Sequence, residues 1–187
     1  MRACYSGVKL IVPYAACLML GSIRLSAATL VQLSLPDMIA QSTVIEHAKV
    51  MGSWAAFSGP AIFTHYKLQV SESLKGAAVT EVVVFGGDAN GVRQIYAGTP
   101  QLTAGEDYVF FLWTNKAGMT HIVGMTQGLF AVAQDGSADP GVTRSATRER
   151  MLDSKTGRDV RDQTLTMKLS DLRTQIASAL SAAKAVR

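Results

Sequence analysis

The chain contains no cysteine after position 17, because Cys4 and Cys17 are the only two cysteines among its 187 residues. A domain without cysteine has no disulfide bond, no thiol nucleophile and no thiolate metal ligand. Disulfide-stapled scaffolds and cysteine-dependent enzymes are therefore excluded for residues 29–187. These residues are numerous enough to fold on an ordinary hydrophobic core, and one domain is the expected count.

The chain also has little excess charge outside its first 28 residues. Three of the 18 Lys and Arg residues lie in that segment and none of the 14 acidic residues does, so residues 29–187 carry a net charge of +1. The sequence pI of about 9.2 is largely a property of the first segment. The charge therefore gives no support for binding nucleic acid, and we expect no nucleic-acid partner.

No apolar run is long enough to span a membrane. The run at residues 10–20 has eleven residues, whereas a spanning helix needs roughly 20. Positive charge precedes this run, and the small residues Ser26-Ala27-Ala28 follow it, as in a secretory signal peptide. Residues 1–28 are predicted to be a signal peptide cleaved after Ala28. The protein is then exported, to the periplasm or the extracellular space, with no stable membrane span after cleavage.

Cys17 offers an alternative, in which it is the acylated residue of a lipoprotein. It follows Ala15-Ala16, but an aliphatic residue is expected where Tyr14 stands. Cys17 also lies inside the apolar run rather than at its end. We therefore prefer cleavage after Ala28.

Short strand-like runs separated by turn residues dominate residues 43–141. One or two helical turns are predicted first, at residues 35–42, and residues 52–60, with two glycines and a proline, are predicted to be a long hairpin loop. The predicted strands lie at residues 43–51, 62–70, 82–85, 92–97, 108–113, 121–125 and 128–133.

The character of the chain changes at residue 142. Residues 29–141 have a net charge of −4, whereas residues 142–187 have a net charge of +5 and are predicted to be a basic extension. Apolar residues at helical spacing predict an amphipathic helix over residues 168–184. The fold class is therefore mostly β. We expect a single domain over residues 29–187, a small antiparallel five- or six-stranded barrel that is OB-like, with a short N-terminal helical turn and a C-terminal helix.

Four segments carry a resemblance to known proteins: residues 38–50 (MIAQSTVIEHAKV), 66–76 (YKLQVSESLKG), 102–112 (LTAGEDYVFFL) and 128–132 (GLFAV). Their order resembles a group of exported bacterial proteins of uncharacterised function. The first half is also similar in pattern to the netrin-like domains of tissue metalloproteinase inhibitors, which are OB-fold barrels. The resemblance implies the fold alone. Those inhibitors act through an N-terminal cysteine, and the predicted mature N-terminus here is Thr29.

Two histidines of the first hairpin are candidate binding residues. Pairing of the two strands about Ala56 would place His47 opposite His65, where two imidazoles could bind a metal ion. No third ligand stands at a recognisable spacing, and Lys49 and Lys67 add positive charge to the same face. We therefore predict no metal site and no cofactor.

Two aromatic residues, Trp54 and Phe57, complete the candidate site. Exposed aromatic side chains on a long loop are common in interfaces, although these two could instead fold over the open end of the barrel. No motif indicates a catalytic residue. The predicted function is a non-catalytic exported domain that binds another exported protein or an envelope component. The alternative is a hydrolase or a metal-dependent enzyme with a scattered site.

Overall fold

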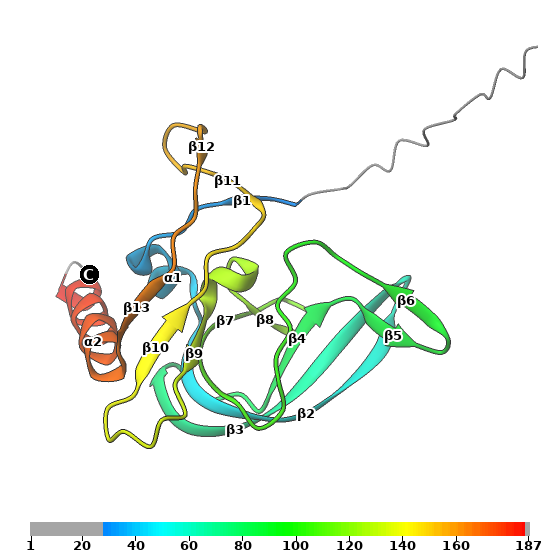
Figure 1. The fold of residues 1–187 in the computed structure, drawn as a ribbon, viewed down its shortest axis with the longest axis horizontal. Helices are drawn as coiled ribbons and strands as arrows, with labels where there is room; N and C mark the ends of the chain where they lie inside the picture. The colour runs from blue at the N-terminus through cyan, green and yellow to red at the C-terminus, as the bar shows by residue number, and fades with distance from the viewer. Residues whose placement is uncertain (1–27, 186–187) are drawn as a thin grey trace, which may run out of the picture.

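The computed structural model describes residues 28–185 (Figure 1), so the predicted signal peptide lies outside the described residues except for Ala28. The helices are α1 (Leu35–Gln41), the 3-10 helix η1 (Met125–Gly128) and α2 (Leu169–Ala185). The strands are β1 (Thr29–Val31), β2 (Val44–Ser58), β3 (Ala61–Lys75), β4 (Glu81–Phe85), β5 (Gly87–Ala89), β6 (Val92–Gln94), β7 (Asp107–Thr114), β8 (Thr120–Ile122), β9 (Leu129–Val132), β10 (Gly141–Arg144), β11 (Arg150–Leu152), β12 (Asp159–Val160) and β13 (Leu165–Lys168).

A curved antiparallel sheet of eight strands forms the body, which confirms the prediction of a mostly β fold with two α-helices. Its order is β13-β10-β9-β7-β2-β3-β4, and β8 also pairs with β7. The number of strands exceeds the predicted five or six. The ladder ends at β13 and β4 without joining them, so a closed barrel is not shown. A second sheet has the order β1-β11-β12, and β5 and β6 form a separate hairpin.

The longest pairing in the protein joins β2 to β3, and the prediction of a loop at residues 52–60 is wrong. The two strands pair as far as Ser58 and Ala61, so only Gly59 and Pro60 form the turn. Gly59 has a φ of +60° there, a conformation that glycine adopts without strain. Irregularities between residues 45 and 52 bend the hairpin. Strand pairing across the hairpin thus overrides the local turn signals of this segment.

Strand β7 supplies both hydrophobic cores, because its two faces are both covered. Phe110 packs inside the curve of the sheet. Phe111, its neighbour in sequence, packs on the outer side beneath α1 and α2. Alternation of side chains along a strand explains why this run is almost wholly apolar.

The helix predicted at residues 35–42 is present as α1, and that predicted at residues 168–184 is present as α2. Ser34 caps α1, and Asp37 completes a capping box with it. Residues 142–187, predicted to be a basic extension, contribute β10 and β13 to the main sheet and α2 to the outer core. Within residues 28–185, no helix combines the length and apolarity that a membrane crossing requires.

Candidate functional site

The aromatic residues predicted as one contact surface, Trp54 and Phe57, lie in β2 rather than in a loop. The ladder is regular from Gly52 to Ser58. Because successive side chains of a strand point to opposite faces, two residues three positions apart lie on opposite sides of the hairpin. Trp54 and Phe57 therefore lie on opposite faces of the hairpin. A binding role for either residue alone stays a prediction.

The predicted pairing of His47 with His65 is also wrong. The turn lies at residues 59–60 instead of at Ala56, so His47 pairs with Glu72 and His65 with Trp54. The His65 ring stacks on the Trp54 indole at 5.1 Å between centroids. Within residues 28–185, no three His, Cys, Asp or Glu side chains gather in a group that could hold a metal ion.

His47 lies in a different setting, on the side of β2 that faces α2. Its Nε2 atom is 3.8 Å from a carboxylate oxygen of Asp107 and has no hydrogen-bond partner. Burial lowers the pKa of His47, and the negative charge of Asp107 opposes that shift only in part. His47 and His65 therefore belong to two separate environments.

The structure instead brings together aromatic rings from β3, β4, β7 and β8 and from the segment that follows β6. His121 of β8 lies 5.3 Å from Trp113 of β7 and stacks on Phe85 of β4, with 5.6 Å between centroids and 11° between planes. Phe85 also contacts Phe63 of β3 at 5.0 Å and Tyr96 at 5.7 Å. We call these five residues the aromatic surface.

Three members of the aromatic surface are substantially exposed to solvent. Trp113, Tyr96 and Phe85 have exposed fractions of 41%, 41% and 43%. Phe63 and His121 are buried beneath them. Sequence reasoning missed this surface because its rings come from strands whose register was not known. The one local signal was the presence of large aromatic residues at the ends of two apolar runs, Phe85 and Trp113.

Hydrogen bonds fix the protonation state of His121. Its Nδ1 atom lies 3.2 Å from the carbonyl oxygen of Val83, which can only accept, so Nδ1 carries the hydrogen. Its Nε2 atom lies 3.3 Å from the Asn115 amide nitrogen. The Asn115 side-chain oxygen accepts from two backbone N–H groups, which orients the NH₂ group as the donor to Nε2. Burial lowers the pKa of His121. His121 is therefore a neutral ring whose two nitrogens are both engaged.

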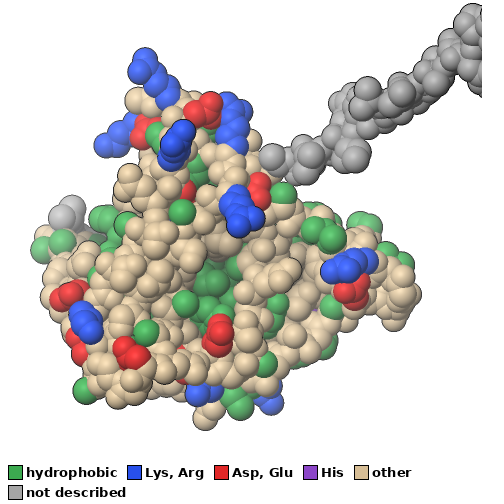
Figure 2. Space-filling view, viewed as in Figure 1, with side chains coloured by type: hydrophobic (Ala, Val, Ile, Leu, Met, Phe, Trp, Pro, Cys, Tyr) green, Lys and Arg blue, Asp and Glu red, His purple; other side chains and the backbone are tan. Residues whose placement is uncertain are grey.

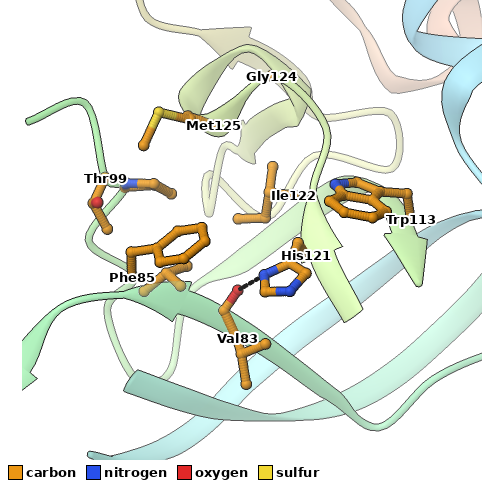
Figure 3. A pocket seen from close by; sticks show the side chains of 10 residues that line it. Val83, Phe85, Thr99, Trp113, His121, Ile122, Gly124 and Met125 are labelled. Carbon is orange, nitrogen blue, oxygen red and sulfur yellow. Dashed lines mark hydrogen bonds between the residues drawn. The ribbon is translucent and has the colours of Figure 1, made fainter. Parts of the chain in front are cut away.

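His121 also spans the gap between two strands. β8 lies beside β4, but the described residues contain no backbone ladder between them. The bond from His121 to Val83 is the hydrogen bond that crosses this gap (Figure 3). We call the gap the β4–β8 seam.

An apolar cavity of about 200 Å³ opens at the seam, where the labelled side chains of Figure 3 surround it. No charged side chain lines it. The residues that line it are Val83, Val84, Phe85, Thr99, Pro100, Trp113, His121, Ile122, Gly124 and Met125. His121 is the only one of these with an ionisable side chain, and both of its ring nitrogens already have partners. The cavity therefore offers apolar contact rather than acid–base chemistry.

One face of the molecule is uneven in its chemistry. Figure 2 shows hydrophobic side chains at the floor of a hollow near the centre of the viewed face, whereas Lys and Arg side chains gather over β11 and β12.

No protein-family model matches this chain, and no curated protein matches it.

Proposed function

We propose that this chain is an exported, non-catalytic binding domain, and that its aromatic surface contacts another exported protein. The observation that supports this proposal is the exposure of Phe85, Tyr96 and Trp113, each more than 40%. Phe85 and Trp113 line the apolar cavity, and Tyr96 contacts Phe85. Aromatic side chains are enriched in protein interfaces and carry much of their binding energy. The exposed parts of these three rings form apolar surface that a binding partner could bury.

The chemistry of the cavity favours binding over catalysis. A general acid or base needs a ring nitrogen that is free to exchange a proton with a substrate. Both nitrogens of His121 already have partners, and the one hydroxyl at the cavity belongs to Thr99. A hydrolase or metal-dependent enzyme, the alternative from the sequence, has no comparable support at this site.

We also propose that the fold is an OB-like barrel. The approach of β8 to β4 is what an OB-like barrel would need in order to close, with His121 standing at the point of closure. The similarity in pattern to netrin-like domains supports the same description. An envelope component, rather than a soluble exported protein, is the other partner class that the exported location would allow.

Photo-crosslinking tests the proposed function. A photoreactive amino acid at Tyr96 places the probe on the aromatic surface. The same amino acid at Phe57 is a matched control, because Phe57 has the same exposed fraction of 41% and lies at the hairpin tip. In the exported fraction of the producing cell, we expect a protein crosslink at position 96 only. It should disappear when Phe85→Ala and Trp113→Ala are added. Equal crosslinking at both positions, or none at position 96, would contradict the proposal.

A further inference from the structure

Strand β4 has a free backbone edge. The Leu68 N–H donates to the Thr80 carbonyl and the Gly86 N–H donates to the Ile62 carbonyl, both at 2.8 Å, so the even-numbered residues of β4 face β3. Backbone groups alternate in direction along an antiparallel strand. The residues whose N–H and C=O groups face away from β3 are therefore Glu81, Val83 and Phe85.

The opposing edge of the seam, on β8, is also unpaired. The Val123 N–H donates to the Phe111 carbonyl at 2.8 Å, which directs the odd-numbered residues of β8 toward β7. By the same alternation, the backbone groups of Thr120 and Ile122 face β4. In the described chain the seam is bridged by the His121 side chain at Val83, two residues before Phe85. The backbone N–H and C=O of Phe85 therefore have no ladder partner on this side within the described residues, although β8 lies beside β4.

The size of the apolar cavity indicates what could enter it. About 200 Å³ is less than the roughly 300 to 1,000 Å³ of pockets that hold drug-sized molecules. It is enough for one apolar side chain. Since the cavity borders the free edge at Phe85, a side chain placed there could belong to a segment whose backbone pairs with β4.

A second cavity continues the first along β4. It holds about 260 Å³, and the two cavities share Val84, Phe85, Thr99 and Pro100. In contrast to the first cavity, polar and charged side chains contribute to its lining, among them Asp88, Arg93 and Gln94. An extended chain can place side chains of different polarity in two adjoining cavities.

We propose that the occupant of this site is an extended segment of another exported protein, which adds to the free edge of β4 at Phe85 and inserts an apolar side chain into the first cavity. Addition of a strand to a sheet edge takes its affinity from backbone hydrogen bonds and its specificity from side-chain pockets. Both features lie together at Phe85. The inference rests on the proposed function, since it names how the partner binds.

The experiment uses a displayed library of nine-residue peptides, selected on the exported protein. Enriched peptides are synthesised and then N-methylated at one position at a time, which removes single backbone donors. We expect N-methylation at one position, the peptide residue that donates to the Phe85 carbonyl, to weaken binding about tenfold, and at the neighbouring positions to have little effect. Trp113→Ala, which removes a wall of the cavity, should weaken binding to a similar extent. Met51→Ala is the control, because Met51 is 52% exposed but lines neither cavity.

The outcomes separate the two proposals. If Trp113→Ala weakens binding but every N-methylated peptide binds normally, strand addition is wrong and the proposed function stands. If no peptide is enriched, or the enriched peptides are insensitive to Trp113→Ala, the inference is overturned, and photo-crosslinking at Tyr96 decides the proposed function independently. If the enriched peptides match a strand of this chain and the protein is dimeric, the occupant is a second copy and a foreign partner is ruled out.

Discussion

The side-chain oxygen of Gln127 accepts a hydrogen bond of 2.8 Å from the backbone N–H of Leu33, 94 positions earlier in the chain. The amide nitrogen of Gln127 donates to the carbonyl of Val31 at 3.0 Å. One amide thus bonds an N–H and a C=O two residues apart, as a neighbouring strand would. Gln94 makes the same pair of bonds to the tip of the β2–β3 hairpin. Side-chain amides therefore replace strand pairing at two places in this fold.

Replacing Gln127 should loosen the N-terminal segment. Gln127→Ala leaves two backbone groups without partners beneath a side chain that is only 1% exposed, so we expect a loss of about 1 to 3 kcal/mol in the free energy of unfolding. Urea unfolding measures it. Gln134→Ala is the control, because Gln134 is exposed and makes one bond, to Gly105. Equal losses in the two variants would contradict this account of Gln127.

Two Arg–Asp pairs of the C-terminal region should differ in their effect on stability. Arg144 and Asp162 are almost fully buried and lie 2.7 Å apart. Removing one partner of a buried pair typically costs about 3 to 5 kcal/mol, because the other charge stays buried and unpaired. Arg144→Met should show this loss in thermal or urea unfolding. Arg150→Met breaks the exposed pair with Asp159, and little change is expected. A small loss of stability in Arg144→Met would mean that water hydrates the Asp162 carboxylate in the variant, so that its charge is not left buried and unpaired.

Glu46 should make the protein less stable as the pH rises. Its side chain is fully buried, with one oxygen bonded to the Val79 N–H and the other without a partner. Burial raises its pKa above the ordinary value of 4.5. The folded state therefore holds this proton more tightly than the unfolded state. Its contribution to stability falls as the pH rises from 4.5 through the folded-state pKa, and then levels off.

Glu46→Gln tests this expectation. The variant cannot ionise, so the difference in unfolding free energy between it and the wild type should grow with pH and favour the variant at neutral pH, by about 1 kcal/mol or more. Urea unfolding at several pH values measures the difference. Asp88→Asn, an exposed acid changed in the same way, should behave like the wild type. A pH-independent difference for Glu46→Gln would show that the carboxyl group does not titrate abnormally.

His121 should act in the opposite direction. Burial lowers its pKa below 6.5, so the unfolded chain binds this proton more readily than the folded protein does. Stability is then lost as the pH falls from 6.5 through the folded-state pKa. His121→Gln should reduce the slope of stability against pH in this range, and His47→Gln should do so as well, because burial also lowers the pKa of His47. An unchanged slope in the double variant would refute the assignment.

Processing of the N-terminus can be checked directly. Cleavage after Ala28 would leave all of β1 in the mature chain, where it pairs in parallel with β11. If residues 1–28 are a signal peptide, the intact mass of the mature protein should correspond to a chain that begins at Thr29. Ala28→Phe should block cleavage, whereas Cys17→Ser should have no effect. A Cys17→Ser variant that loses a lipid would instead identify a lipoprotein.

Local patterns predicted the elements whose signals are contained within one turn or one strand. The helical turns predicted at residues 35–42 agree with the observed bounds of α1 to within one residue. The apolar run at residues 82–85 correctly predicted β4, and the helical spacing of apolar residues at 168–184 correctly predicted α2. The aromatic surface was not predicted, because no local sequence pattern shows that aromatic residues from separate strands come into contact.

The sequence by itself determined the mostly β class, the two α-helices and the absence of cysteine after position 17, because propensity, spacing and composition are properties of neighbouring residues. Only the tertiary structure decided that β2 continues to Ser58, which places Trp54 and Phe57 on opposite faces. It also decided the register of β2 on β3, which separates His47 from His65. It also decided the contact between His121 and Val83. Such pairings depend on which distant strands lie side by side, and a shift of one residue in register moves every side chain to the other face.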